Sequence, residues 1–410
     1  MNDLDQLFRE ATDHVRSPDL VGGALASAHR RRVRRTAVGA LAAVVLMGGG
    51  AAWVLQDPTP RAGVVDTPEP TPSPTATPSA VGTDEAKMGT QPLWDPFTVV
   101  DSPGGPTVLP EVLAPPADAP SVLDAAIPAA VVAWPEEDRP IMLLSPLGDW
   151  RSIPGTESIA PSSLRDVASP AISSDGRLVT FAAEAGLWVV DVVAGEQRLL
   201  PWPEQVAEAW DTPPGVRWMP GDEAVLVMHW NTPWVMGLDG SDVSAAYLGQ
   251  YAGGIAIDPD GPLLERRFRT GTLVEWRDGE VVRRVDDGGI AWGERAVAGS
   301  GLFAITGGLG GGAFAGPIVI DATTGARVAY APIRDEDSVY SDNGHLTAMG
   351  FLDEETVLLL VTPMDFRTMQ AGDARTHLVV WDFTTGDFEL LASGGPGMRS
   401  IAVAPDLLDD

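Results

Sequence analysis

Candidate catalytic side chains are few and widely spaced in this sequence of 410 residues. His229, His345 and His377 stand apart, and none belongs to a His-x-x-x-His pair that would place two imidazoles on one metal ion. Only 5 histidines occur in all, so groups that titrate near neutral pH are scarce. We interpret each of the three as an ordinary strand or loop histidine, and the sequence predicts no metal site.

Two glycine-containing motifs match catalytic or nucleotide-binding signatures only in part. Ser300 lies in Ala298-Gly-Ser-Gly301, which lacks the first glycine of the Gly-x-Ser-x-Gly nucleophile turn. The glycine-rich run 307–312 does not open a helix after a strand, as a dinucleotide-binding loop does. We interpret this run as a turn or a close approach between sheets. The sequence therefore predicts no catalytic residue and no cofactor.

Acidic side chains are abundant but do not match a metal-binding pattern. Asp335–Asp337 and Asp342–Gly344 lack the full spacing and the terminal glutamate of a calcium loop, so a solvated surface and a weak calcium site both fit. The 57 acidic and 27 basic residues give a net charge of −30, which argues against nucleic-acid binding because phosphate contacts need clustered cations. The absence of cysteine excludes disulfides, thiol nucleophiles and cysteine-ligated zinc.

Most of the 13 tryptophans fall in or beside apolar segments. Large aromatic side chains in such positions usually fill the core between sheets. Trp202, Trp210 and Trp218 are distinguished by their position around a proline-rich connection. These three are therefore candidates for a ligand-binding surface, with packing in the core as the alternative.

One segment near the N-terminus is long and apolar enough to cross a membrane. Residues 36–55 carry no charge over 20 residues, and a helix of that length spans a hydrocarbon core of about 30 Å. Basic residues precede the segment and Asp57 follows it, which predicts a cytoplasmic N-terminus and an extracytoplasmic C-terminal part in the cell membrane. These basic residues are Arg30, Arg31, Arg32, Arg34 and Arg35. A cleaved signal peptide and a buried core helix are the alternatives.

The regions on either side of this span differ in character. Residues 1–35 contain two short apolar stripes at helical spacing, so we expect a helical cytoplasmic segment. We favour a solvated helix next to the membrane, with docking on a partner protein or on the membrane surface as the alternative. Residues 56–93 are rich in proline and threonine, which predicts an extended linker. Residues 94–125 remain proline-rich and are interpreted as a lead-in to the folded domain, which is expected over residues 126–410.

A hairpin with a glycine in its turn recurs six times in the C-terminal part. Each copy is an apolar strand, a polar turn and a second strand, as in Leu378–Leu391. Glycine suits the turn because it accepts positive φ without steric cost. The turn glycines are Gly148, Gly195, Gly240, Gly279, Gly325 and Gly386. Their spacing is mostly about 40–50 residues, with one longer interval attributed to an insertion at 362–376, and matches a four-stranded propeller blade.

Short strands that end in an acidic or glycine turn precede most of these hairpins, as in Ile255–Gly261. Elsewhere an apolar strand ends in an aspartate that is followed by a Thr-Gly turn, as from Asp382 to Gly386. This combination resembles the WD40-like and TolB-like propellers. The resemblance implies an all-β fold, and we count six blades, with a seventh from residues 94–125 as an alternative. Ile401–Asp406 matches the first strand of a blade, so we expect the C-terminus to complete the first sheet and close the ring.

Three functions fit this organisation. The first is a membrane-anchored, extracytoplasmic propeller that binds a ligand or protein without catalysis. The second is a transmembrane sensor, because the N-terminal segment, arginine cluster, single span and linker resemble actinobacterial membrane anti-sigma factors, although the zinc motif of that family is missing. The third is an extracytoplasmic hydrolase or lyase with carboxylates in a central channel. The sequence favours the first.

Overall fold

The computed structural model describes residues 107–408, with internal gaps. The gaps are residues 137, 158–169, 209–213, 230–231, 246–247, 249–251, 260, 310–314, 333–345, 362–374 and 396–399. The expected cytoplasmic segment, membrane span and linker, residues 1–93, lie outside the described residues, as do His345, Trp210 and both acidic loop motifs. Among the described helices, none has the length and apolar character of a membrane span.

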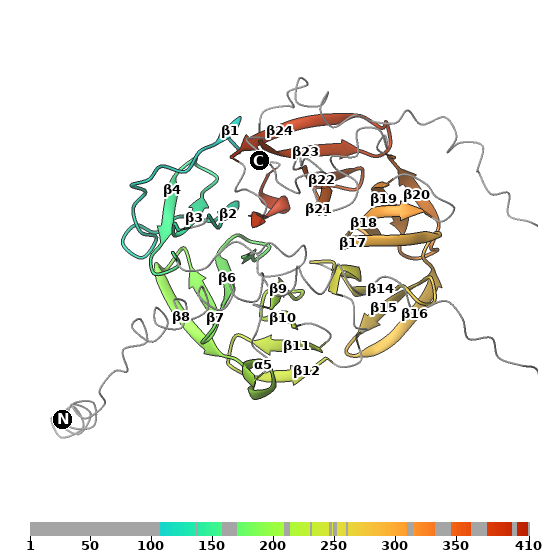
Figure 1. Cartoon of the computed structure of the whole chain (residues 1–410), viewed down its shortest axis with the longest axis horizontal. Helices are drawn as coiled ribbons and strands as arrows, with labels where there is room; N and C mark the ends of the chain where they lie inside the picture. The colour runs from blue at the N-terminus through green and yellow to red at the C-terminus, as the bar shows by residue number, and fades with distance from the viewer. Residues whose placement is uncertain are drawn as a thin grey trace, which may run out of the picture. The chain divides into compact units, whose positions relative to one another are not determined.

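Six sheets form a ring, and the first strand of each sheet lies nearest the centre (Figure 1). Each sheet contains four antiparallel strands, and the last sheet carries a fifth strand at its outer edge. A ring of radial, four-stranded sheets is a β-propeller. The predicted all-β fold with six blades is therefore confirmed for the described part of the chain.

The first three blades each extend outward from an innermost strand. Blade 1 contains β25 (Ala402–Val403), β2 (Val132–Trp134), β3 (Ile141–Leu144) and β4 (Trp150–Ile153). Blade 2 contains β5 (Ala171–Ile172), β6 (Leu178–Ala183), β7 (Gly186–Asp191) and β8 (Glu196–Pro201). Blade 3 contains β9 (Gly215–Trp218), β10 (Ala224–His229), β11 (Thr232–Gly237) and β12 (Asp242–Ser244).

The other three blades follow the same order. Blade 4 contains β13 (Ile255–Ile257), β14 (Leu263–Arg267), β15 (Thr272–Arg277) and β16 (Glu280–Asp286). Blade 5 contains β17 (Ile290–Gly299), β18 (Leu302–Leu309), β19 (Ala315–Asp321) and β20 (Arg327–Tyr330). Blade 6 contains β21 (Leu346–Phe351), β22 (Thr356–Val361), β23 (Thr376–Asp382), β24 (Phe388–Gly394) and the edge strand β1 (Val112–Leu113). Short helices are α5 (Glu204–Glu208), η1 (Ala252–Gly254) and η4 (Pro405–Leu407).

The six predicted hairpins are the two outer strands of the six blades. All six turn glycines have positive φ, between 69° and 87°, the left-handed conformation that favours glycine. In several turns an aspartate at the end of the third strand supports the backbone. The Oδ1 atom of Asp382, for example, accepts hydrogen bonds from the N–H groups of Thr384 (2.8 Å) and Thr385 (3.0 Å). The predicted turn chemistry is thus confirmed.

The hydrophobic core lies between neighbouring blades. Successive side chains on a strand point to opposite faces of its sheet, so one strand serves two interfaces. On β14, Leu263 packs with residues of blade 3, whereas Leu264 packs with residues of blade 5. The same alternation on β15 places Val274 between blades 3 and 4, and Leu273 between blades 4 and 5. Each blade is therefore held from both sides.

The ring is closed by the C-terminal strand. β25 pairs antiparallel with β2, with Val403 opposite Val132 and Ala402 opposite Ala133. Ile401 has no exposed surface and packs in the cluster between blades 6 and 1. The prediction that the C-terminus completes the first blade is confirmed, because the chain supplies the innermost strand of that blade from its far end.

Residues 111–127, which we name the outer strap, run along the outer edges of blades 6 and 1 and reach the turn between β7 and β8 in blade 2. β1 pairs in parallel with β24 of blade 6, and the N–H of Ser393 donates to the carbonyl of Glu111 (3.0 Å). Further along, Ser121 bridges to Ser152 at the edge of blade 1. The N–H of Ile127 then donates to the carbonyl of Val192 in blade 2 (3.0 Å).

The outer strap changes the interpretation of the proline-rich region expected as a lead-in over 94–125. Its described part, from residue 107, packs on the sheets, and Leu113 and Val122 are almost fully buried. In this part of the chain the strap supplies one edge strand and one bridge, and the described residues form six blades without a seventh.

Candidate functional site

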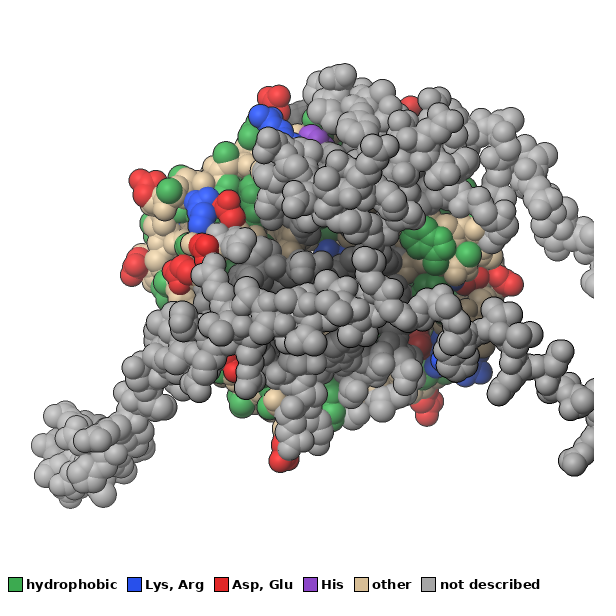
Figure 2. Space-filling view, viewed as in Figure 1, with side chains coloured by type: hydrophobic (Ala, Val, Ile, Leu, Met, Phe, Trp, Pro, Cys, Tyr) green, Lys and Arg blue, Asp and Glu red, His purple; other side chains and the backbone are tan. Residues whose placement is uncertain are grey.

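A cavity of about 210 Å³ lies at the centre of the ring, where the innermost strands converge. In the space-filling view of Figure 2, part of a basic side chain is visible near the centre of the ring. Every blade contributes residues to the wall, and most of these residues have apolar side chains. One representative from each innermost strand is Val403, Ile172, Trp218, Ile257, Val297 and Met349.

Arg217, in the innermost strand of blade 3, is one of two cations in the wall. Its side chain is half-buried and reaches across the ring. Nη1 donates a hydrogen bond to the carbonyl of Ile255 in blade 4, and a second to the carbonyl of Ala296 in blade 5 (3.0 Å). The guanidinium of Arg217 therefore connects the innermost strands of three blades beside the cavity.

Arg295, in the innermost strand of blade 5, is the second cation. Its φ of 45° lies in the left-handed region, which is unusual for a residue other than glycine. The register between β17 and β18 shifts between Glu294 and Val297, so Arg295 lies within a β-bulge. A non-glycine residue in this conformation costs on the order of 1–3 kcal/mol, a strain often found where a side chain must be directed into a site.

Trp218 contributes part of its side chain to the same wall. The side chain is 9% exposed, packs between blades 2 and 3, and lines the cavity. Among the described atoms its Nε1 has no hydrogen-bond partner. A buried donor without an acceptor costs about 1–3 kcal/mol.

Trp202, the second tryptophan of the predicted ligand surface, is not among the residues that line this wall. Trp202 is 7% exposed, belongs to the core between blades 2 and 3, and donates from Nε1 to the carbonyl of Ala183 (2.8 Å). Trp210 lies outside the described residues. Within the described chain, the predicted trio is thus divided into one cavity residue and one core residue.

The chemistry of the cavity wall combines apolar surface with positive charge. Its described side chains are aliphatic, methionine, proline, tryptophan and the two arginines, without a carboxylate, imidazole or hydroxyl group. A guanidinium remains protonated and offers five N–H donors in a planar fork, which suits carboxylate and phosphate oxygens. This arrangement can bind and orient an anionic group.

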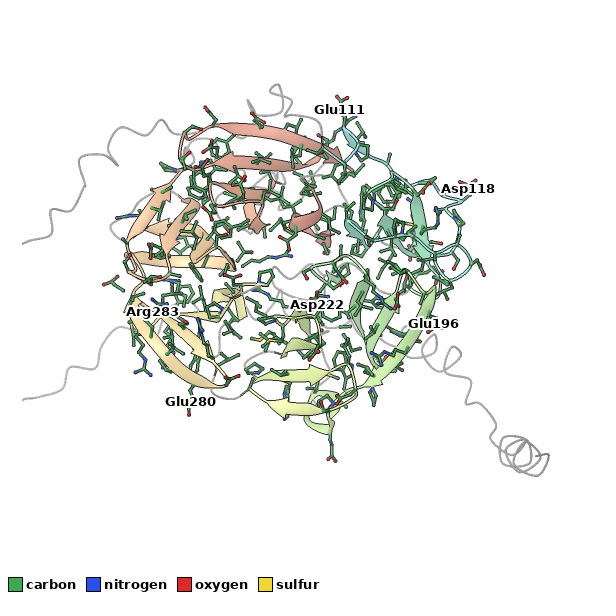
Figure 3. The ribbon with its side chains drawn as sticks, turned by 180° about the vertical axis from the view of Figure 1, so that it is seen from behind. Glu111, Asp118, Glu196, Asp222, Glu280 and Arg283 are labelled. Atoms are coloured by element: carbon green, nitrogen blue, oxygen red, sulfur yellow. The ribbon has the colours of Figure 1, made fainter. Side chains whose placement is uncertain are left out.

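Asp222 is a carboxylate near the centre of the ring on the face seen in Figure 3. It lies in the turn between β9 and β10 with a φ of 54°. Its Oδ2 accepts hydrogen bonds from both the N–H (3.0 Å) and the hydroxyl of Ser174, in the corresponding turn of blade 2. Asp222 therefore links two neighbouring turns and is not among the residues of the cavity wall.

A histidine and a serine that the sequence did not pair are brought together in blade 6. His377 Nδ1 and Ser393 Oγ lie 2.8 Å apart, and both side chains are 6% exposed. The pair joins β23 to β24 next to the edge strand β1. Burial, together with the charge of Arg375, lowers the pKa of His377, which favours the neutral form of the ring. The pair lies outside the cavity wall, and we assign it a structural role.

Blade 4 contains a buried charged cluster that sequence reasoning missed. Arg266 is almost fully buried, and its Nε donates to Asp287 Oδ2 (2.9 Å). Glu275, 2% exposed, pairs with Arg277 and with Arg283, which Figure 3 labels at the outer rim. The signal available in the sequence was the run Leu-Leu-Glu-Arg-Arg, which puts three charges in one strand that must be buried on both faces.

The serine and glycine motifs considered in the sequence lie in a turn and in a strand, where they have structural roles. Ser300 and Gly301 form the turn between β17 and β18, both at positive φ. Gly307 and Gly308 lie in β18, where a Cβ atom would collide with Trp292 of β17, so the glycines permit close strand pairing. Within the described residues, no group of three or more His, Asp or Glu side chains is arranged to hold a metal ion.

Comparison with known proteins adds a likeness of fold. No protein-family model matches this chain, and neither does any curated protein. The chain is similar to TolB. The solved structure of TolB from Acinetobacter baumannii is 14% identical, with a TM-score of 0.40, over 65% of this chain and 66% of that chain. This chain therefore spans just under two thirds of that TolB.

Solved structures of other proteins resemble this chain with similar TM-scores. A catalytically inactive virginiamycin B lyase from Staphylococcus aureus, solved with quinupristin, is 13% identical, with a TM-score of 0.39, over 62% of this chain and 78% of that one. A nidogen/laminin complex contains a chain that is 10% identical, with a TM-score of 0.39, over 67% of this chain and 98% of that one. The closed ring of six sheets establishes the fold. Function must be argued from the site, because one fold can serve many functions.

Proposed function

We propose that this chain is a membrane-tethered binding module whose propeller recognises an extracytoplasmic ligand in its central cavity. The observation that carries the proposal is the wall of that cavity, where apolar side chains from six strands line the same space as Arg217 and Arg295. Apolar surface with a few well-placed polar groups is the usual composition of a recognition site. Because guanidinium groups stay protonated, they act here by binding and orienting a ligand.

The fold supports recognition because it makes the site rigid. Each innermost strand is the first of four hydrogen-bonded strands, and each blade packs against both neighbours. Side chains on such strands lose little freedom on binding, which reduces the entropic cost of association. The hydrogen bonds from Arg217 to blades 4 and 5 fix one of the two cations in the same way.

The proposed location outside the cell rests on the N-terminal sequence. Residues 36–55 would anchor the chain, the arginines at 30–35 would hold the N-terminus in the cytoplasm, and residues 56–93 would separate the propeller from the membrane. Residues 1–35 would then be available to a cytoplasmic partner, which is the sensor form of the same proposal. Because the chain has no cysteine, single substitutions report this topology directly. In intact cells, a membrane-impermeant maleimide should label Ser73→Cys and leave Ser27→Cys unlabelled.

Photo-crosslinking tests the binding function in intact cells that produce the full chain. A photoreactive amino acid replaces Met349 or Ile172 in the cavity wall, and in a control it replaces Leu147, which is 76% exposed in the turn between β3 and β4. We expect one and the same adduct, identified by mass spectrometry, from both cavity positions and not from position 147.

Two results would contradict this function. One is the absence of any adduct at both cavity positions while the protein is folded and labelled at residue 73. The other is the same adduct from Leu147, because a ligand captured equally at the outer turn is not held by the cavity.

A further inference from the structure

We propose that residues 94–100 bind along β20, the outer strand of blade 5, as an additional edge strand that continues the outer strap by one blade. This contact is separate from the central cavity. Three observations support it: a bulge that recurs on three outer strands, the cover that the strap region gives to one of them, and the sequence before the strap. The linker expected over residues 56–93 would then leave the propeller at blade 5.

The outer strands of blades 4, 5 and 6 each contain one bulged residue with an apolar side chain. Register shifts leave Val282 of β16, Val328 of β20 and Leu391 of β24 without a residue opposite them in the third strand. A bulge leaves its extra residue unpaired and bends the strand locally. The three blades therefore present the same local irregularity at their outer edges.

The three bulged residues differ in what covers them. Leu391 is half-buried and packs against the cluster that contains Leu109 and Leu113, from the segment that enters the outer strap. The equivalent residues of the other two blades, Val282 and Val328, are 55% and 48% exposed. Burial of apolar surface is favourable, so an edge strand over Val328 would be stabilised as the strap is on blade 6.

The outer strap shows how the chain passes from one blade edge to the next. It contacts the outer strands of blades 6 and 1 in the same parallel direction. The step from Val112, opposite Ser393, to Ser121, opposite Ser152, takes nine residues. Blade 5 lies next to blade 6 on the side away from blade 1 (Figure 1). Val100 precedes Val112 by 12 residues, a longer segment than that step, so the chain before the strap can reach β20.

The sequence before the strap repeats the arrangement found at β1. In β1 an apolar pair, Val112 and Leu113, is followed by a proline-rich connection to the next blade. Before the strap, Val99 and Val100 form an apolar pair, and residues 101–106, with two prolines and two glycines, follow it. The two residues before this pair are phenylalanine and threonine, which also favour strands. This segment therefore has the composition of a second edge strand.

Cysteine crosslinking tests the contact in the full chain, which has no cysteine of its own. Val328→Cys is combined in turn with Phe97→Cys, Val99→Cys and Val100→Cys, and disulfide formation under mild oxidation is followed by mass spectrometry. We expect at least one pair to form an intramolecular disulfide about ten-fold faster than the same pair made with Val282→Cys, because bound segments have a higher effective concentration. Val282 is the matched control, since it is the equivalent bulge residue of blade 4 and is similarly exposed.

Hydrogen exchange gives a second measurement that needs no new bond. Val99→Asp combined with Val100→Asp places two charges where the segment would be half-buried, which opposes binding. In this variant the amides of β20 should exchange about ten-fold faster than in the original chain, whereas those of β16 should be unchanged.

Equal rates of disulfide formation at Val328→Cys and Val282→Cys would overturn the proposal, because a freely moving segment reaches both positions. Unchanged exchange at β20 in the aspartate variant would overturn it as well. A disulfide between two copies through Val328→Cys, without the intramolecular product, would assign this edge to a second copy instead. None of these results bears on the cavity, which the adducts from Met349 and Ile172 test separately.

Discussion

Val403 lies opposite Val132 in one sheet, although the two residues come from opposite ends of the described chain. The N–H of Ala404 also donates to the carbonyl of Val131 (3.0 Å), so the closure continues beyond the paired strand. At the outer side of the ring, β1 pairs with β24 and closes the same junction between blades 6 and 1 a second time. The ring is therefore joined at the centre by the C-terminus and at the rim by the outer strap.

Removal of the C-terminal strand should destabilise the whole propeller. A chain that ends at residue 399 loses Ile401, Val403 and Leu408, which are all buried. At about 1.5–3 kcal/mol for each buried aliphatic side chain, the loss is about 5 kcal/mol or more, and the inner edge of blade 1 is left unpaired. Thermal unfolding followed by circular dichroism measures the effect. A chain that lacks only Asp409 and Asp410 is the control, and equal melting temperatures for both truncations would contradict the proposed role of β25.

The outer strap offers two neighbouring residues that test its packing. Leu113 is 2% exposed, whereas Val112 beside it is 45% exposed. Leu113→Ala should cost about 2–5 kcal/mol because it leaves a cavity in the core between blades 6 and 1. Val112→Ala should change stability by no more than about 0.5 kcal/mol. Denaturant unfolding gives both values, and similar small effects would show that the strap is not part of the cooperative unit.

The buried ion pair in blade 4 should be sensitive to loss of one partner. Asp287→Asn removes the negative charge that lies 2.9 Å from Arg266, while both side chains are buried. We expect a loss of about 3–5 kcal/mol, because the buried cation keeps its cost of desolvation. Arg177→Gln, which breaks an ion pair in which Arg177 is 54% exposed, should cost much less, because solvent screens the charges of an exposed pair. If denaturant unfolding shows equal losses for the two variants, burial is not the deciding factor.

Acid should weaken the propeller partly through its turn aspartates. The N–H of Thr385 and the hydroxyl of Thr384 hold the pKa of Asp382 below its ordinary value of 3.8. A carboxyl whose pKa is lower in the folded state contributes stability above pH 3.8, and this contribution is lost as the pH falls through the folded-state pKa. Asp382→Asn keeps an oxygen acceptor but does not titrate.

Unfolding free energies between pH 2.5 and pH 6, at about half-unit steps, check this prediction. The stability of the original chain relative to Asp382→Asn should rise with pH and become constant above about pH 5. A difference that does not change over this range would contradict the assigned cause of the pKa shift.

The repeated part of the fold could be predicted because its signals are local. The turn between β23 and β24 requires a residue with positive φ, and Gly386 supplies it. The same order of strand, glycine turn and strand recurs in every blade. The pairing of β25 could be predicted since Ile401–Asp406 matched a first strand that blade 1 lacked. β17 was not identified, because its two register shifts interrupt the alternation on which strand prediction depends.

The outer strap and the cavity could not be predicted for a different reason. Residues 111–127 are proline-rich and show no alternation, and their partners Ser393 and Ser152 are distant in the sequence. Arg217 and Arg295 belong to separate strands with nothing in their local sequence to relate them. Their position beside one cavity follows from the order of blades around the ring, which is a property of the closed structure.

The closure by Val403 also fixes when the propeller can be completed during synthesis. Blades 2 to 5 are each formed by consecutive segments and can pair as they leave the ribosome. In blade 1, β2 is made at Val132–Trp134, but it waits for its innermost partner until Ala402 and Val403 have been made. Until then the edge of β2 that faces the axis is unpaired, so a newly made chain has a period in which chaperone binding or aggregation competes with ring closure.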